Sequence, residues 1–262
     1  LPGDHALLVP KTRDGRVLFA VPWLGKLILG TTDTPRHDLA LEPEPFGHEV
    51  AFILNESARY LRRAPQRADV RSCWVGLRPL VKPAEASDDG TKALSREHTV
   101  LVSRSGLVTV TGGKWTTYRA MAEDVLGKCM ADALLPHRPG GATLKQLLVG
   151  ANAGASNPHP LSQASDLSAY GSEAAAVEAL PGAGRQLAGG LTEAMVRFAV
   201  RHEYARTVED VLARRVRLLF LDARLAGSLA AAVGAIVAEE TGCDPEIAAF
   251  EALAAKYLHL PA

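Results

Sequence analysis

The sequence has few cysteines and no excess of charge, and each shortage argues against a class of protein. Its three cysteines, Cys73, Cys129 and Cys243, lie far apart and form no C-x-x-C pair. An odd number of isolated cysteines fits a reducing compartment, and we expect each to be a small buried side chain. The 29 basic and 29 acidic residues cancel, so the basic excess of a nucleic-acid-binding domain is missing and no nucleic acid is expected as a partner.

Long apolar runs and targeting segments are also missing. The longest weakly polar run, residues 225–238, is too short to span a bilayer and predicts a buried helix. The chain begins Leu-Pro-Gly-Asp-His, without an initiator methionine or a secretory signal, so we expect an excised piece of a longer cytoplasmic protein. Hydrophobic residues make up 47%, which is enough to bury a core in one large domain or in two to three small ones.

Most catalytic motifs are absent. No G-x-G-x-x-G opens a strand-turn-helix unit, and a Walker A loop is excluded because Val108 and Trp115 stand where a glycine and a Ser or Thr are needed. The sequence has no serine-nucleophile elbow, no H-E-x-x-H and no Cys/His cluster with metal spacing. We therefore expect no metal site, and the sequence assigns no catalytic residue.

The patterns that are present predict a mixed α+β fold. Short β-rich runs over residues 6–33 indicate a meander, with turns at Asp14-Gly15 and Leu24-Gly25. Apolar spacing predicts helices from Glu49 to Arg63 and from Trp115 to Leu135. Between them, we expect a surface loop over residues 81–93 and a hairpin over residues 98–113 that turns at Ser105-Gly106.

The composition changes after about Pro136, and the pattern becomes helical from Leu191 onward. Thr207 and Asp210 have the spacing of a capping box. Asp244 is the expected N-cap of the last helix, with Pro245 at its first position. Residues from about 150 are therefore predicted to form a small helical domain. In it, Arg214, Arg215 and Arg217 are either a solvated basic face or, equally well, partners of Glu209 and Asp210 in ion pairs.

The stretch TVTGGKWTTYR, residues 109–119, places Gly112, Gly113 and Lys114 between a predicted strand and a predicted helix. Glycines let the backbone approach a ligand closely, and the free amides and dipole of a helix start favour negative charge. Lys114 adds a full positive charge. An ordinary turn with a solvated lysine explains the motif slightly better, if the motif is considered alone.

Two arginines could hold an anion as well. Arg78 lies in the apolar run WVGLRPLV, where a guanidinium requires a carboxylate or phosphate partner; a buried ion pair with an acid such as Asp33 is about equally good. Arg96, in LSREHTV, lies near a predicted strand start, and the adjacent His98 is the weakest of these signals.

Taken together, these segments resemble the C-terminal half of the FAD-dependent (aerobic) glycerol-3-phosphate dehydrogenases. The resemblance rests on VLFAVPW, LILGTTDTP, GLRPLV, LSREHTV, GLVTVTGGKWTTYRAMAEDV and YARTVEDVLARRVRLLFLDA. It covers almost the whole chain, and GGKWTTYR together with ARTVEDVLARR is specific to this family.

The resemblance implies three parts. Residues 1–72 would end a substrate-binding β-sheet domain, residues 73–149 would be the closing strand-helix piece of an FAD-binding α/β domain, and residues 150–262 would be an all-α C-terminal domain. It also implies site residues. Arg78, Arg96 and Lys114 would bind the substrate, and the turn that begins with Gly112 would lie against the flavin. The residues expected at the cofactor are Gly112, Gly113, Lys114, Trp115 and Thr116.

The function implied is oxidation of sn-glycerol 3-phosphate to dihydroxyacetone phosphate, with FAD as cofactor and membrane quinone as electron acceptor. Peripheral contact with the cytoplasmic face of the inner membrane, through the basic residues Arg214, Arg215 and Arg217, and a homodimer are also expected. The isolated chain is expected to be inactive, because the dinucleotide-binding fingerprint of the family is not among its residues. Two alternatives stay open: an oxidase that uses oxygen, and a non-catalytic interaction module.

Overall fold

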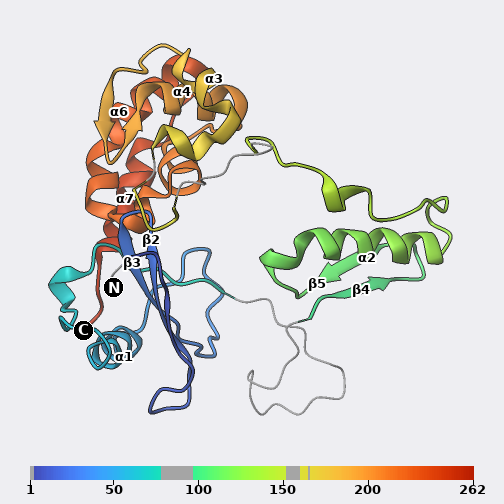
Figure 1. Ribbon diagram of the computed structural model, residues 1–262, viewed down its shortest axis with the longest axis horizontal. Coiled ribbons are helices and arrows are strands. Elements are labelled where there is room, and N and C mark those ends of the chain that lie inside the picture. The colour runs from blue at the N-terminus through green and yellow to red at the C-terminus, as the bar shows by residue number, and fades with distance from the viewer. Residues whose placement is uncertain (1–2, 78–96, 152–159, 165) are drawn as a thin grey trace. The chain divides into compact units, whose positions relative to one another are not determined.

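The computed structural model describes residues 3–77, 97–151, 160–164 and 166–262 (Figure 1). The chain divides into two compact units, and each is described by itself. The helical unit comprises Leu1–Thr34, Asp38–Val75 and Val149–Ala262, and the hairpin unit comprises Pro35–His37 and Gly76–Leu148. Helices and small antiparallel sheets are both present, which confirms the predicted mixed α+β class.

The first part of the helical unit is the predicted meander. Strands β1 (Leu7–Val9), β2 (Leu18–Trp23) and β3 (Lys26–Gly30) pair antiparallel in that order. The β2–β3 turn pairs Trp23 with Lys26 and holds Leu24 and Gly25 at positive φ, as a two-residue hairpin turn requires. Helix α1 (Gly47–Ser57) and the short η1 (Arg67–Asp69) follow.

The core of the helical unit lies among its C-terminal helices. Helix α4 (Glu193–His202) packs on α6 (Ala223–Thr241), which also packs on α7 (Ile247–Leu258). Fully buried side chains from these helices and their connections, Phe198, Leu212, Val233 and Phe250 among them, form one apolar cluster. The smaller elements around it are η5 (Leu167–Glu173), α3 (Ala174–Glu178), β6 (Gln186–Ala188), β7 (Leu191–Thr192), the π-helical η6 (Asp210–Arg215) and α5 (Leu218–Leu221).

The meander and the late helices belong to the same compact unit. The Leu24 amide donates to the Leu161 carbonyl at 2.6 Å, and Trp23 and Leu24 pack against the helical core. The Ser72 hydroxyl likewise donates to the Leu219 carbonyl at 2.8 Å. The segments predicted as the first and third domains are therefore joined by contacts, while the functional assignment of the three domains stays a prediction.

The hairpin unit is small and has little core. Strands β4 (Thr99–Val102) and β5 (Val108–Thr111) form the predicted hairpin, followed by η3 (Trp115–Thr117), α2 (Tyr118–Ala131) and η4 (Ala142–Lys145). Among the described residues of this unit, Cys129 is the single buried apolar side chain. The predicted loop over residues 81–93 lies outside the described residues.

Several sequence-based boundaries were wrong. The first helix ends at Ser57 and not at Arg63, because the Tyr60 and Leu61 amides both donate to the Ser57 carbonyl and the regular ladder stops. Asp244 does not cap α7; its carboxylate accepts the Glu246 amide at 2.9 Å in a local turn, and the helix begins at Ile247. Cys129 is buried as predicted, but Cys73 is half-buried and Cys243 is exposed.

No helix among the residues that the structure describes is both long enough and apolar enough to cross a membrane. The run over residues 225–238 belongs to α6, whose apolar side chains pack into the core of the helical unit. The prediction of a buried helix for this run is confirmed.

Candidate functional site

The turn after β5 has a structural reason for its two glycines. Gly112 and Gly113 have φ of 75° and 81°, a backbone conformation that residues with a side chain rarely adopt. A Cβ on Gly113 would lie 2.6 Å from Met121 Sδ and 3.0 Å from His98 Cβ, and one on Gly112 would lie 2.6 Å from the Glu97 carbonyl oxygen. The turn therefore requires glycine at both positions in order to pack against the start of β4 and against α2, whether or not a ligand binds.

Lys114 and the helix start that follows it are open. The Lys114 side chain is exposed, and its carbonyl accepts both the Thr117 amide and the Thr117 hydroxyl at 3.0 Å. Within the described part of the chain, no acceptor receives the Trp115 or Thr116 amide. Two free N–H groups beside an ammonium group suit an anion, because the amides carry partial positive charges and the ammonium group carries a full one. Lys114, Trp115 and Thr116 lie after the end of β5 and at the start of η3, and the role of these residues and of Gly112 and Gly113 at the cofactor stays a prediction.

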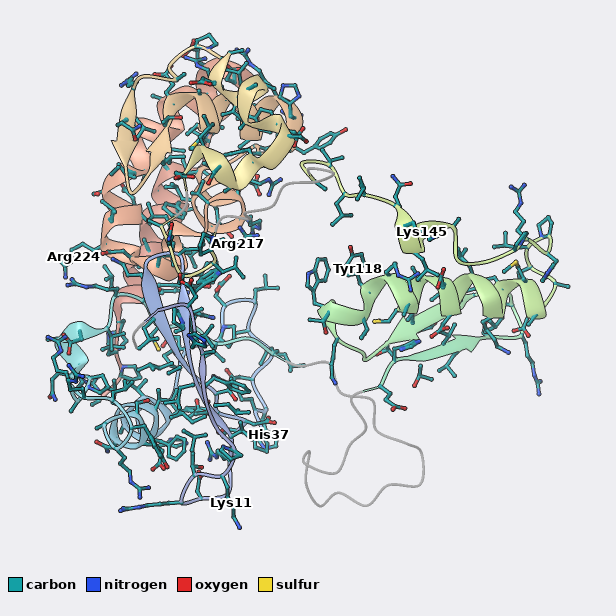
Figure 2. The ribbon with its side chains drawn as sticks, in the orientation of Figure 1. Lys11, His37, Tyr118, Lys145, Arg217 and Arg224 are labelled. Atoms are coloured by element: carbon teal, nitrogen blue, oxygen red, sulfur yellow. The ribbon has the colours of Figure 1, made fainter. Side chains whose placement is uncertain are left out.

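Side chains around the turn form contacts that sequence spacing did not reveal. His98 Nε2 lies 2.8 Å from Asp124 Oδ2, which ties the segment before β4 to α2. Trp115, 85% exposed, stacks on Tyr118 with ring centroids 5.4 Å apart; Tyr118 opens α2 and is labelled in Figure 2. The only sequence signal for the His98–Asp124 pair was the placement of both residues in elements adjacent to the glycines.

On the other side of α2, Arg119 pairs with Glu123 at 2.9 Å, and Glu123 also accepts the Gly141 amide at 2.9 Å. The hydrogen bond from Arg119 lowers the pKa of the Glu123 carboxyl. These contacts stabilise the chain reversal after α2 and add no further cation to the turn.

The two arginines predicted to bind the substrate, Arg78 and Arg96, lie outside the described residues. The alternative ion pair between Arg78 and Asp33 is therefore also untested. Of the three predicted substrate-binding residues, the structure places only Lys114, and the convergence of all three on one anion stays a prediction.

Of the two interpretations of the basic face at Arg214, Arg215 and Arg217, ion pairs with Glu209 and Asp210 are confirmed for Arg214. Thr207 and Asp210 form the predicted capping box, with amide contacts of 3.1 Å and 3.2 Å. Arg214 contacts Glu209 at 2.5 Å and Asp210 at 3.1 Å, and Arg215 donates to the Glu203 carbonyl. Only the third, Arg217, is exposed without a carboxylate partner among the described residues.

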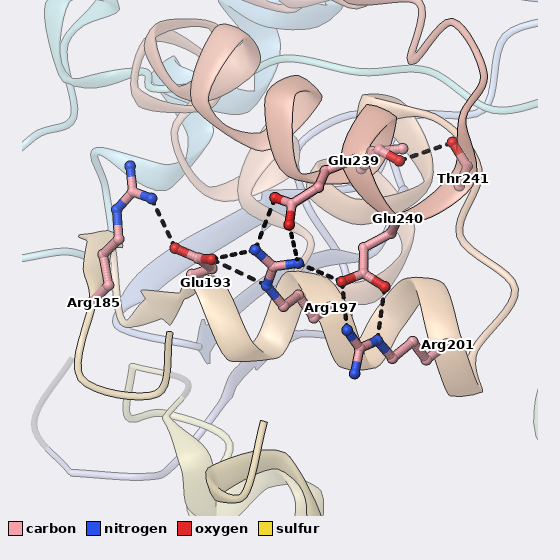
Figure 3. A network of polar contacts seen from close by, with 8 residues as sticks. Arg185, Glu193, Arg197, Arg201, Glu239, Glu240 and Thr241 are labelled. Atoms are coloured by element: carbon pink, nitrogen blue, oxygen red, sulfur yellow. Dashed lines mark hydrogen bonds and ion pairs between the residues drawn. The ribbon is translucent and has the colours of Figure 1, made fainter. Parts of the chain in front are cut away.

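A second polar cluster, which sequence analysis missed, joins α4 to α6 (Figure 3). Arg197, only 7% exposed, contacts Glu193 at 2.6 Å and Glu239 at 2.9 Å, and also binds Glu240. Arg201 contacts Glu240 at 2.7 Å, and its hydrogen bond lowers the pKa of Glu240 to about 2. Because the Arg197 guanidinium meets three carboxylates, the cluster has a structural role and leaves no free group for chemistry.

Two family models match the chain. Residues 2–119 match the model of FAD dependent oxidoreductases, and residues 139–247 match the model of the C-terminal domain of alpha-glycerophosphate oxidase. The chain is 38% identical to the mitochondrial glycerol-3-phosphate dehydrogenase SDP6 of Arabidopsis thaliana, over 91% of this chain and 42% of that protein. It is 37% identical to the mitochondrial glycerol-3-phosphate dehydrogenase of Homo sapiens, over 86% of this chain and 33% of that protein.

The fold agrees with a solved relative. The structure is similar to a glycerol-3-phosphate dehydrogenase from Bacillus halodurans complexed with FAD, with a TM-score of 0.73, 23% identity, and coverage of 98% of this chain and 54% of that chain. At that identity the likeness concerns the fold. The chain therefore spans about half or less of the length of these relatives. The two family models and relatives of 37–38% identity together cover most of the chain, and the chain belongs to the family of FAD-dependent glycerol-3-phosphate dehydrogenases.

Proposed function

We propose that this chain contributes to an enzyme that uses FAD to oxidise the C2 hydroxyl of sn-glycerol 3-phosphate to the ketone of dihydroxyacetone phosphate. The observation that supports this most is the open helix start at Lys114, Trp115 and Thr116, which presents an ammonium group and two free amides together. Glycerol-3-phosphate dehydrogenases are the relatives that carry the matching sequence.

The proposed role of this chain's residues is to bind and stabilise negative charge on the cofactor and the substrate. When bound, FAD supplies the acceptor for the hydride that leaves C2, while the hydroxyl proton goes to a base that the described residues do not identify. Lys114 and the two amides would hold a negatively charged edge of the cofactor or substrate in a fixed position. Donors fixed before the reaction stabilise developing charge without reorganisation. Arg78 and Arg96 are proposed as partners of the substrate phosphate, for which a planar guanidinium is well suited.

Membrane quinone is the proposed electron acceptor, since the relatives are named dehydrogenases. One observation favours a second candidate: the C-terminal model is named for alpha-glycerophosphate oxidase. An oxidase would reduce oxygen to hydrogen peroxide, so peroxide production measured against quinone reduction separates the two. Peroxide formed in step with substrate oxidation, with no gain from added quinone, would contradict the quinone proposal.

A homodimer and peripheral contact with the cytoplasmic face of the inner membrane are proposed with it. Arg214 is paired with Glu209 and Asp210, and Arg215 donates to the Glu203 carbonyl. Of these basic residues, Arg217 is the one whose charge is most available to an anionic membrane surface among the described residues. Liposome flotation with and without anionic lipid tests the membrane proposal. Equal flotation with both lipids, or none with either, would contradict electrostatic docking. A non-catalytic role of the helical unit would instead show as a protein partner bound independently of FAD.

Lys114→Ala tests the site directly. In an FAD-loaded form of the enzyme, kcat/KM for glycerol 3-phosphate should fall by about 10- to 150-fold, since a lost charge-assisted hydrogen bond costs about 1.5–3 kcal/mol. Lys128→Ala is the matched control, because Lys128 lies in the last turn of α2, away from the glycine turn, and pairs with Asp132 at 3.1 Å. An unchanged kcat/KM for Lys114→Ala would remove the site assignment.

The 262-residue chain by itself should show no turnover and weak FAD binding, because no G-x-G-x-x-G is available for the pyrophosphate. Calorimetric titration with FAD and dye reduction with glycerol 3-phosphate measure both properties. Micromolar FAD binding (a binding free energy of about 8 kcal/mol) or substrate-dependent turnover by the purified chain would contradict this expectation.

A further inference from the structure

The helical unit contains a cavity that plays no part in the proposed reaction. Its volume is about 1330 Å³, and it is lined by the β2–β3 turn, by η5, by the β6–β7 turn and by the segment from Arg214 to Leu218. Ligand sites for small organic molecules are concave and mostly apolar, with a few converging polar groups. This cavity is large enough to hold such a molecule together with several water molecules.

The apolar part of the wall belongs to the core of the unit. Trp23 and Leu24 come from the hairpin turn, and Leu191, Leu218 and Leu225 come from the helical part. The backbone of Gly189 lies closely against two of them, since a Cβ there would be 3.4 Å from Leu218 and 3.5 Å from Leu225. A bound molecule would therefore meet a packed apolar surface on one side.

The charged part of the wall includes two cations without an ion-pair partner. Arg214 is paired with Glu209, and the Asp222 carboxylate accepts the Leu225 amide. Arg215 donates to the Glu203 carbonyl, and its Nε lies 3.9 Å from the Glu203 carboxylate. Lys26, Glu173 and Arg217 remain, and none of them has an ion-pair partner among the described residues. Lys26 and Arg217 are therefore the two cations of this wall with which a bound anion can pair.

Burial shifts the pKa of two groups on this wall. Burial raises the pKa of the Glu203 carboxyl, with Arg215 and Arg217 acting in the opposite direction and Glu173 adding to the rise. Burial also raises the pKa of Tyr170, so its hydroxyl stays a neutral donor. Arg217 has a positive φ of 57°, an uncommon conformation for a side-chain-bearing residue that is found more often at functional positions. Figure 2 labels Arg217.

We infer that this cavity binds a small organic anion, with a phosphate or carboxylate head between Arg217 and Lys26 and an apolar body against Trp23 and Leu218. Both cations line the same cavity as the apolar wall. A guanidinium and an ammonium group are the ordinary partners of phosphate and carboxylate oxygens. A purely inorganic anion would leave the apolar wall uncovered, and an uncharged molecule would leave the cations without a partner.

The test uses the purified chain and four probes: phenyl phosphate, benzoate, inorganic phosphate and benzyl alcohol. Trp23 lines the cavity while Trp74 and Trp115 do not, so a Trp74→Phe, Trp115→Phe chain reports binding through Trp23 fluorescence. Phenyl phosphate or benzoate should bind saturably with a Kd of about 1 mM or tighter, which is a modest affinity for two charged contacts. Inorganic phosphate and benzyl alcohol should each bind at least about fivefold more weakly, because each makes part of the contacts.

Variants locate the binding site. Arg217→Gln and Lys26→Gln should each weaken phenyl phosphate binding by about fivefold or more, as expected for loss of a charge-assisted contact. Arg224→Gln is the matched control, since Arg224 is an exposed arginine nearby in sequence that does not line the cavity. Lys114→Ala is a second control, because that lysine could bind phosphate in the hairpin unit and its loss should leave the Trp23 signal unchanged.

Circular dichroism of each variant shows that the fold is retained. The inference is overturned if none of the anions binds saturably, or if affinity is the same in Arg217→Gln, Lys26→Gln and Arg224→Gln. Relative affinities of phenyl phosphate and benzoate identify which head group the cavity prefers. Because the readout is binding at Trp23, its failure would leave the proposed dehydrogenase activity untouched.

Discussion

The helical unit and the hairpin unit differ in what holds them together. The helical unit buries a large apolar cluster and a network of charges around Arg197, whereas the described part of the hairpin unit buries one apolar side chain, Cys129. Yet the hairpin unit contains the turn with Lys114 and the open helix start. Stability and proposed chemistry are therefore concentrated in different parts of the chain, as is common when ligand-binding loops come from regions of low local stability.

A large truncation in each unit should show the greatest contrast. Phe198→Ala removes a side chain that is 2% exposed and lies edge-on to Tyr170, so it should lower the free energy of unfolding of the helical unit by about 3–5 kcal/mol. Leu126→Ala, at a side chain that is 52% exposed in α2, should cost about 0.5 kcal/mol or less. Hydrogen exchange in urea, followed separately for α4 and α2, measures both losses of stability. Equal losses would contradict the claim that the helical unit depends more on its core than the hairpin unit does.

Removal of a buried charge should have the next largest effect. Arg197→Leu leaves Glu193 and Glu240 without their central partner, and the loss of one member of a buried ion pair costs about 3–5 kcal/mol, of which packing of the leucine would recover a part. Arg119→Leu breaks the more exposed pair with Glu123, which is worth about 0–1 kcal/mol. Chemical denaturation followed by helical circular dichroism gives both values. A loss below that of Arg119→Leu would mean that the cluster is not a stabilising feature.

Gly113→Val should disturb the hairpin unit locally. The valine would require a positive φ and would meet Met121 and His98, at a cost of about 1–3 kcal/mol. A loss of flavin binding in Gly113→Val would therefore not by itself identify a flavin site, since a damaged turn would cause the same loss. Hydrogen exchange of β5 and α2 is the measurement, with Gly127→Ala, where an added Cβ meets nothing, as the control. Unchanged exchange in Gly113→Val would contradict the packing argument.

Acid should weaken the helical unit by a smaller amount. The pKa of Glu240 is lowered from 4.5 to about 2 by its hydrogen bond from Arg201. A carboxyl with a lowered pKa in the folded state stabilises the fold above its unfolded pKa, and this stabilisation is lost as the pH falls toward the folded pKa. We expect a loss of about 1–2 kcal/mol between about pH 5 and pH 2. Urea midpoints measured across this range should change less in Glu240→Gln, and an equal slope in both proteins would contradict the assignment.

Local features of the fold followed from the sequence. The meander turns at Asp14-Gly15 and Leu24-Gly25, the hairpin turn at Gly106 and the capping box at Thr207 all formed as predicted, because each depends on a few adjacent residues. Helix ends were less predictable. Asp244 has the composition of an N-cap, but the competing local turn onto Glu246 satisfies it first.

The candidate site divides in the same way. Glycines followed by a lysine between a strand and a helix were visible in the sequence, and the structure placed Gly112, Gly113 and Lys114 as that pattern required. The requirement for glycine at 113 was not visible, because it comes from Met121 on α2 and His98 before β4. The His98–Asp124 contact joins residues 26 positions apart, and no local pattern encodes such a distance.

The sequence alone was sufficient to determine the family, the α+β class, the principal turns and the strand-to-helix position of the lysine, since these depend on short-range backbone preferences and on motifs. Long-range packing decided the rest: the Arg197 cluster between helices α4 and α6, the contact of the β2–β3 turn with the helical core, and the cavity that this turn helps to line. Side chains far apart in the chain make these features, and their partners are selected by burial and charge in the folded state.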